Sequence, residues 1–231
     1  MKKDLFRKFD LFEGLSEAEL EKVAALAKPR KYQRDEVIFH ADERGDVFCL
    51  IVTGRVKVTM ISPEGKEIIL SMLGPGDFFG EMALLDDEPR SATVMAVEPL
   101  EVLTVYRDEL LQIMRDDFTI TRNIIAELSK RLRRASRRIE SLVTMDVYGR
   151  LARFLLELAR DQGREVDSGY VAFRRPTHQA IANTIGTSRE TVSRLLHDLM
   201  EQKLLLCEGK TIYLRKGTID QFKERSDGRV E

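Results

Sequence analysis

The first residues of the chain follow the spacing of a helix face. Apolar side chains recur at that spacing between positions 5 and 30, and Ser16 is followed three residues later by Glu19. This pair has the form of a capping box, in which each side chain satisfies a backbone N–H group at the start of a helix. The pattern predicts a short pair of helices at the N-terminus.

A different pattern runs from residue 31 to residue 105. Short β-rich runs are separated by turns, and the glycines of these turns lie nine to eleven residues apart: Gly45, Gly54, Gly65 and Gly74. Regular turns at this spacing are typical of an all-β sandwich or barrel. Within this region, residues 48–60 read as a β-hairpin that turns at Thr53 and Gly54.

Between residues 118 and 145 the pattern is that of one long helix. Neither proline nor glycine interrupts it, and apolar residues recur every three or four positions: Ile125, Leu128, Leu132, Ala135, Ile139 and Leu142. Such a heptad seam is typical of helix pairing, so we expect a homodimer, with a core helix packed on the β-domain as the alternative. Asp146 is a favourable N-cap for the next apolar run, which places the hinge and domain boundary at residues 144–146.

Residues 178–197 have the spacing of a helix-turn-helix. A small residue, Ala182, a turn residue, Gly186, and an apolar residue, Val192, stand fifth, ninth and fifteenth in this unit. Gly186 can adopt a positive φ without strain, and Ala182 lets the two helices approach closely. Residues 203–214 then read as two short strands around a turn, which predicts a wing. A helix pair that binds protein is the alternative.

The polar side chains at the start of the second helix are candidates for reading DNA bases: Arg189, Glu190, Ser193 and Arg194. An arginine can donate two hydrogen bonds to guanine, and a glutamate can accept one from cytosine. Other polar residues nearby are candidates for DNA contacts, mainly to phosphates: Thr177, His178, Gln179, Ser188 and Lys210. The expected partner of this region is double-stranded DNA.

Charge is distributed unevenly over the 231 residues. The net charge is -1, but residues 1–118 carry -8 and residues 119–231 carry +7, so the C-terminal half suits a polyanion. The two cysteines, Cys49 and Cys207, lie far apart and can build neither a zinc nor an iron–sulfur site. No signal peptide and no apolar run of membrane-spanning length is seen. We therefore expect a cytoplasmic protein with no metal and no membrane contact.

Residues 74–94 combine features that suit a small anion. A glycine-rich turn leads into a short apolar helix, and Arg90 with Ser91 opens the next strand. Backbone N–H groups and a bidentate guanidinium favour a phosphate, and the Glu81 carboxylate can accept a sugar hydroxyl. The alternative is a surface arginine that pairs with Glu81 or with one of the two aspartates at 86 and 87.

Two motifs together carry a family resemblance. The run Phe79–Leu85 with Pro89–Ala92 resembles the phosphate-binding cassette of cyclic-nucleotide-binding domains. Taken with the long helix and the run Ser188–Val192, residues 10–222 resemble the cyclic-AMP receptor protein (catabolite activator) and fumarate-nitrate regulator family of bacterial transcription regulators.

The resemblance implies an α+β fold in three parts. An N-terminal β-roll (jelly-roll-like) sensor domain covers residues 1–117, a dimerisation helix and hinge cover 118–145, and a C-terminal winged helix-turn-helix domain covers 146–231. It also implies RNA polymerase as a further partner. Cyclic AMP is the expected allosteric ligand, bound by Arg90 at the phosphate and by Glu81 at the ribose 2′-hydroxyl.

The resemblance also implies the remaining ligand contacts: Gly80, Met82, Ser91 and, from the partner subunit, Ser136. In cyclic-AMP-responsive members a Thr-Ser pair contacts adenine, whereas this chain has Ala135 and Ser136. Cyclic GMP and cyclic di-GMP therefore stay open as ligands. The residues implied to read a palindromic operator with TGTGA-like half-sites are Arg189, Glu190 and Arg194.

These expectations describe a ligand-gated homodimeric transcription regulator. Ligand capture would re-register the long helix and set the distance between two recognition helices. One rival is a constitutive DNA-binding dimer whose sensor domain is inert. Another is a nucleotide-dependent enzyme or an enzyme-regulating subunit, but the sequence shows no Walker loop, metal cluster or nucleophile motif. We therefore expect a protein that is not an enzyme.

Overall fold

The computed structural model describes residues 5–166 and 169–218, and its internal contacts divide the chain into two compact units. The first unit extends to Arg133 and the second begins at Arg134, so the division falls within one long helix. Among the helices of the described ranges, none has the length and apolar character needed to cross a membrane.

The N-terminal segment folds into helices, as its pattern predicts. A 3₁₀ turn, η1 (Asp10–Phe12), precedes helix α2 (Glu17–Leu26). The hydroxyl of Ser16 accepts a hydrogen bond from the N–H of Glu19 at 3.4 Å, and Oε2 of Glu19 accepts one from the N–H of Ser16 at 2.7 Å. These reciprocal bonds confirm the capping box.

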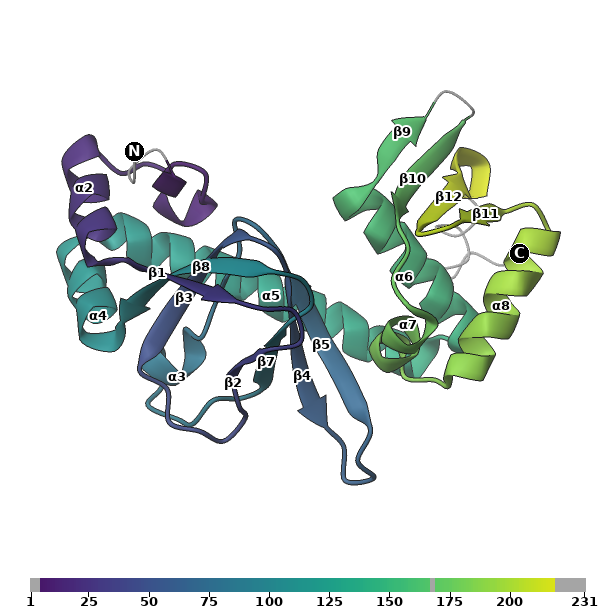
Figure 1. Ribbon diagram of the computed structural model, residues 1–231, viewed down its shortest axis with the longest axis horizontal. Helices are drawn as coiled ribbons and strands as arrows, with labels where there is room; N and C mark the ends of the chain where they lie inside the picture. Colours follow the sequence, from purple (N-terminus) through teal and green to yellow (C-terminus); the bar gives the residue numbers. More distant parts are fainter. Residues whose placement is uncertain (1–4, 167–168, 219–231) are drawn as a thin grey trace. The chain divides into compact units, whose positions relative to one another are not determined.

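Two four-stranded antiparallel sheets form the β-domain of the first unit (Figure 1). The strands of one sheet, in spatial order, are β1 (Lys28–Tyr32), β8 (Leu100–Tyr106), β3 (Val47–Thr53) and β6 (Phe78–Phe79). Those of the other are β2 (Val37–Phe39), β7 (Thr93–Ala96), β4 (Val56–Ile61) and β5 (Glu67–Leu73). Buried apolar side chains from both sheets share one core, which confirms the predicted β-sandwich character.

The expected hairpin over residues 48–60 is wrong. Strand β3 pairs with β6 and β8, whereas β4 pairs with β5 and β7, so the two strands lie in different sheets. The turn at Gly54 carries the chain between the sheets, and a Cβ there would lie 2.3 Å from the carbonyl oxygen of Pro99. Neighbouring β3 residues lie in two different cores, Leu50 in one and Ile51 in the other. A strand that is buried on both faces lacks the alternation that reveals its partner.

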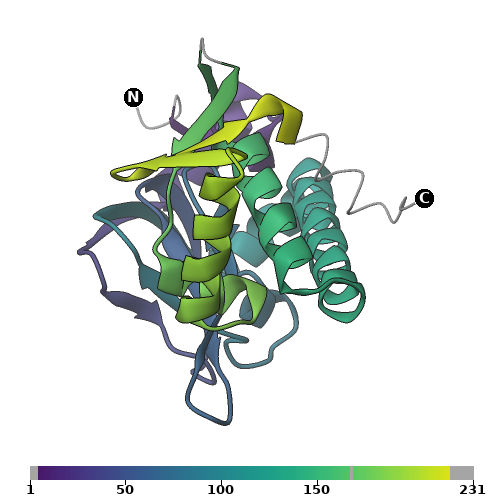
Figure 2. The same cartoon turned by 90° about the vertical axis from the view of Figure 1, so that its right-hand side faces the viewer.

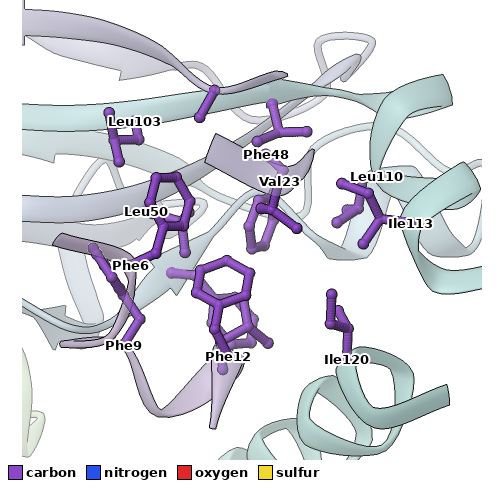
Figure 3. Close-up of a cluster of buried hydrophobic side chains, with 14 of the residues drawn as sticks. Phe6, Phe9, Phe12, Val23, Phe48, Leu50, Leu103, Leu110, Ile113 and Ile120 are labelled. Atoms are coloured by element: carbon purple, nitrogen blue, oxygen red, sulfur yellow. The ribbon is translucent and has the colours of Figure 1, made fainter. Parts of the chain in front are cut away.

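Helices cover the other face of the β1-β8-β3-β6 sheet. Helix α4 (Arg107–Asp116) and the first turns of α5 (Phe118–Thr144) share a core with that sheet and with the N-terminal helices. Figure 3 shows side chains of this core, which include Phe6, Phe9, Phe12, Phe48, Leu103, Ile113 and Ile120. Helix α5 is therefore anchored at its start to the β-domain.

Helix α5 has two distinct apolar faces. Ile120 and Ile124 are buried in the core of the first unit, as a helix packed on the β-domain requires. Four of the heptad residues are instead exposed, with relative accessibilities of 55% for Ile125, 69% for Leu132, 64% for Ile139 and 51% for Leu142. The long helix is confirmed, and most of its seam is not used by the cores of its own chain.

The second unit joins the end of α5 to a winged helix-turn-helix (Figures 1 and 2). Its elements are α6 (Val147–Gln162), β9 (Arg164–Val166), β10 (Tyr170–Arg174), α7 (His178–Ile185), α8 (Arg189–Glu201), β11 (Leu205–Glu208) and β12 (Thr211–Arg215). The strand order is β11-β12-β10-β9. Oδ1 of Asp146 accepts a hydrogen bond from the N–H of Gly149 at 2.7 Å, which confirms the predicted N-cap of α6. The predicted wing is the hairpin of β11 and β12.

Candidate functional site

The candidate anion-binding cassette, residues 79–92, begins where β6 turns into the short helix α3 (Met82–Leu85). Gly80 stands at this turn with φ of +85°, a conformation that favours glycine. A Cβ at Gly80 would lie 2.8 Å from Nη1 of Arg90 and 2.8 Å from the carbonyl oxygen of Val47. The missing side chain therefore lets the backbone approach the arginine closely.

Arg90 lies inside the first unit, where only 5% of its surface is exposed. Its Nη1 donates to the carbonyl oxygen of Gly80 at 2.7 Å, and its Nη2 donates to that of Val47 at 2.8 Å. Burial lowers the pKa of the guanidinium, and an anion beside it would raise that pKa again. The surface arginine of the alternative interpretation is not what the structure has, and Asp87 forms its ion pair with Arg107 instead.

Glu81 is the second buried charge of the cassette, with 4% of its surface exposed. Its Oε1 accepts a hydrogen bond from Nη1 of Arg131, on α5, at 3.0 Å. Nη2 of Arg131 also donates to the carbonyl oxygen of Phe78 at 2.6 Å. Burial raises the pKa of Glu81, and the charge of Arg131 opposes that shift. Arg131 is not apparent from the sequence pattern, because it is one of several basic residues on α5 and lies 50 positions from Glu81.

Met82 and Ser91 lie at the exposed side of the cassette. Met82 is 48% exposed, and the Ser91 hydroxyl donates a hydrogen bond to its sulfur at 3.5 Å. The fold thus gathers five of the six predicted ligand residues, Gly80, Glu81, Met82, Arg90 and Ser91, around one turn. The sixth, Ser136, belongs to the second unit, where it is exposed on α5.

The helix-turn-helix has the local geometry that its sequence predicts. Helix α7 ends at Ile185, and its C-cap Gly186 makes the turn with a φ of +69°, while Ala182 and Val192 are fully buried beneath it. The hydroxyl of Ser188 accepts a hydrogen bond from the N–H of Thr191 at 3.1 Å and so caps α8. Thr177 caps α7 in the same way, through the N–H of Ala180 at 3.1 Å.

The candidate base readers are all exposed on the first turns of α8: Arg189, Glu190, Ser193 and Arg194. Beside them lies a cavity of about 610 Å³, lined by Arg175, Pro176, Thr177, His178, Gln179 and Arg189. Lys210 is exposed in the wing turn, and its carbonyl oxygen accepts a hydrogen bond from the N–H of Arg175 at 2.8 Å. The cavity therefore joins candidate phosphate contacts to a candidate base reader.

Two residues of this cavity have a position or an environment that the sequence alone does not show. Arg175 lines the cavity although the sequence does not single it out as a contact, since it only follows another arginine just before α7. His178 is partly buried, and its pKa is lowered by that burial and by the charges of Arg175 and Arg189. A nearby anion would raise the pKa of His178, because an anion stabilises the protonated form of the ring.

Comparison with known proteins identifies both halves of the chain. Residues 29–117 match the family model of the cyclic nucleotide-binding domain, and residues 149–216 match that of the Crp-like helix-turn-helix domain. The first match contains the cassette with Arg90 and Glu81, and the second contains the exposed start of α8.

The similarity to known proteins extends over nearly the whole chain. The cyclic AMP receptor protein of Thermus thermophilus is 34% identical over 209 residues, which are 90% of this chain and 94% of that protein. The CRP-like cAMP-activated global transcriptional regulator of Mycobacterium tuberculosis is 28% identical over 91% of this chain and 94% of its own length. The structure of the c-di-GMP responsive global regulator CLP of Xanthomonas campestris has a TM-score of 0.76 and 25% identity, over 87% of this chain and 99% of that one. The chain therefore belongs to the CRP/FNR family of cyclic-nucleotide-binding transcription regulators, which are not enzymes.

Proposed function

We propose that the protein is a homodimeric transcription regulator whose DNA binding is gated by a cyclic nucleotide, with cyclic AMP as the first candidate. The observation that carries this proposal is a buried guanidinium and a buried carboxyl in one cassette, at Arg90 and Glu81. A guanidinium suits the cyclic phosphate, and a carboxylate suits the ribose 2′-hydroxyl. Gly80 and Ser91 would complete the phosphate rim, and Met82 would add a further ligand contact.

The choice among cyclic nucleotides rests on the base. Relatives that are 28–35% identical are named as cAMP-activated regulators or cyclic AMP receptor proteins, which supports cyclic AMP. The structure of a regulator named as c-di-GMP responsive is also similar, which keeps cyclic di-GMP as the alternative, beside cyclic GMP. In our proposal Ser136 of the partner subunit contacts the base, while the methyl group of Ala135 offers it no hydrogen bond.

Dimerisation is proposed to occur through the heptad seam of α5. Ile125, Leu132, Ile139 and Leu142 are each more than half exposed, and together they form a stripe along one side of a 27-residue helix. A stripe of this kind loses little conformational entropy on pairing, because the helix already exists, and it buries apolar surface against the same stripe of a second copy. Such pairing is symmetric and closes at two chains.

Gating is proposed to act through the contacts that Arg90 and Glu81 already make. A cyclic phosphate would compete with the carbonyls of Gly80 and Val47 for Arg90, and a ribose hydroxyl would compete with Arg131 for Glu81. Because Arg131 lies on α5, this exchange changes what holds the cassette to the long helix. A ligand with different affinities for the two arrangements shifts the population between them.

The DNA reader is proposed to bind a palindromic operator with TGTGA-like half-sites. Arg189, Glu190 and Arg194 would contact bases, and a symmetric dimer places its two recognition helices one turn of DNA apart, about 34 Å. Thr177, His178, Gln179, Ser188, Ser193 and Lys210 would add contacts around them. RNA polymerase is the proposed further partner, and the cytoplasm is the compartment where these partners occur.

A titration of fluorescent operator DNA tests the proposal. The DNA carries a palindrome of TGTGA-like half-sites, and anisotropy is measured with cyclic AMP, cyclic GMP, cyclic di-GMP or no nucleotide. We expect cyclic AMP to strengthen binding of the wild-type protein and to have no effect on Arg90→Ala, whose folding is checked by its melting curve. Equal affinities with and without every nucleotide would instead identify a constitutive DNA-binding dimer with an inert sensor.

A further inference from the structure

We propose that Phe39 is a positioning residue, which holds the guanidinium of Arg90 in the orientation in which it meets the phosphate of the ligand. The part of this inference that concerns a ligand rests on the proposed function. The contact itself is direct, because Cζ of Arg90 lies 3.8 Å from the centre of the Phe39 ring. The face of an aromatic ring attracts a cation, and the attraction grows where water is excluded, as it is around this buried arginine.

The space around the guanidinium is bounded by two glycines as well as by the ring. A Cβ on Gly45 would lie 2.5 Å from Cζ of Arg90, and a Cβ on Gly80 would lie 2.8 Å from Nη1 and 3.0 Å from the Phe39 ring. A Cβ at either position would therefore displace the guanidinium, so the missing side chains leave the space in which it lies. Together with Phe39 the two glycines form a slot that fits a planar guanidinium and restricts its rotation.

The segment that begins at Phe39 also holds the main chain of Arg90. The N–H of Arg90 donates to the carbonyl oxygen of Glu43 at 2.8 Å, and the N–H of Asp42 donates to the carbonyl oxygen of Arg90 at 2.9 Å. At the end of the same segment, Val47 supplies the carbonyl that accepts Nη2. Residues 39–47 therefore fix both the backbone and the side chain of Arg90, the residue that is proposed to bind the phosphate.

The Phe39 ring is itself fixed in place. It meets the ring of Phe79 edge to face, with centroids 5.5 Å apart and an interplanar angle of 62°. Phe79 immediately precedes Gly80, so the ring of Phe39 packs against the segment whose carbonyl accepts a hydrogen bond from Arg90. A leucine at position 39 would keep the apolar contacts in part but would lack the negative ring face that attracts the cation.

Two variants separate the ring from the apolar volume, namely Phe39→Leu, which removes the ring, and Phe39→Tyr, which keeps it. The first measurement needs no ligand: the Nε–H resonance of Arg90, assigned with Arg90→Lys, reports the ring current of Phe39 in the full-length protein. We expect this resonance to move and its hydrogen exchange to accelerate in Phe39→Leu but not in Phe39→Tyr. Phe48→Leu, which removes a ring from the other core of the unit, serves as the control for general loosening.

The second measurement is the affinity for cyclic AMP by calorimetry. We expect Phe39→Leu to weaken binding about tenfold and Phe39→Tyr to restore it. An unchanged Arg90 resonance in Phe39→Leu overturns the positioning role whatever the ligand does. An unchanged affinity overturns the role in ligand binding, as does a tyrosine variant that behaves like leucine. If the wild-type protein binds no cyclic nucleotide but the resonance moves as expected, the proposed ligand fails and the positioning of Arg90 stands.

Discussion

The buried charges of the first unit are held by groups of the protein itself. Arg90 donates to two backbone carbonyls, and Glu81 accepts from Arg131. A buried ion without a partner is strongly destabilising, so these contacts keep the fold stable before any ligand arrives. A ligand at this site must replace some of the contacts that Arg90 and Glu81 make with the protein. This replacement is how ligand binding can be transmitted to the rest of the protein. The residues at the start of α8 are exposed and need no such compensation.

Glu190 is expected to determine sequence preference rather than overall affinity. Glu190→Ala removes an acceptor for cytosine, so discrimination at one base pair should fall by about 1–3 kcal/mol while other sequences bind as before. Operator variants substituted at single positions, measured by anisotropy, check this. Lys210→Ala is the matched control, because loss of a phosphate contact weakens all sequences alike and lowers the salt dependence. Uniform weakening by Glu190→Ala would show that Glu190 does not read a base.

DNA affinity is expected to rise as the pH falls, through His178. In the protein alone, burial, Arg175 and Arg189 lower the pKa of His178 from its ordinary value of 6.5, so the ring is neutral at neutral pH. A DNA phosphate beside the ring favours the protonated form and raises that pKa in the complex, so binding takes up a proton. Affinity should therefore increase as the pH falls below the pKa of the complex and level off below the pKa of the protein alone.

Anisotropy titrations between about pH 5.5 and 7.5 measure this linkage. The pH dependence should disappear in His178→Gln and persist in His197→Gln, because His197 lies beside Glu201 in the last turns of α8. A His178→Gln variant that keeps the wild-type profile would exclude His178 as the group that takes up the proton.

At the scale of elements, α5 packs into both units, through its first turns in one and through its last turns in the other. Its start packs into the first core through Ile120 and Ile124, while its end is fastened within the second unit. There, Arg153 of α6 donates to the carbonyl oxygen of Arg137 at 3.1 Å, and Arg138 donates to that of Thr184 at the end of α7. These bonds explain why the last turns of α5 belong to the DNA-reading unit.

The seam of α5 provides a prediction about assembly. Leu132→Asn puts a polar group at the most exposed of the four seam residues, so pairing would require that group to lose its hydration. We expect analytical ultracentrifugation to show a shift from dimer toward monomer. Glu140→Asn, an exposed position of the same helix outside the seam, should leave the dimer intact. A Leu132→Asn protein as dimeric as the wild type would rule out this seam as the interface.

At the scale of the whole molecule, the two compact units have separate cores, so we expect the ligand to stabilise the unit that binds it and not the other. Cyclic AMP at about 100 times its dissociation constant should stabilise the unit that binds it by about 2.7 kcal/mol. Scanning calorimetry should therefore show the transition of the first unit moving to higher temperature with ligand and returning when the ligand is dialysed away. The same scan of Arg90→Ala should show no shift, and a shift of equal size in that variant would place the ligand elsewhere.

Much of the fold could be predicted because the decisive interactions are local. The capping box at Ser16, the N-cap at Asp146 and the turn at Gly186 each depend on residues within a few positions of one another. The cassette motif likewise gathers Gly80 to Ser91 within one short stretch. The prediction of a hairpin at Gly54 is wrong for the opposite reason. The strands that pair with a strand buried on both faces lie far away in the sequence, so no local pattern identifies them.

The amino-acid sequence by itself determined the order of the elements, the long helix and the two motifs, because helix periodicity, turn chemistry and caps act over a few residues. Only the tertiary structure decided what surrounds the functional charges. Phe39 and Gly45 reach Arg90 because β2 pairs with β7 and the segment after β2 returns to β3, and Arg131 reaches Glu81 because α5 packs on the sheet. Contacts between residues far apart in the chain depend on packing, which no local pattern encodes.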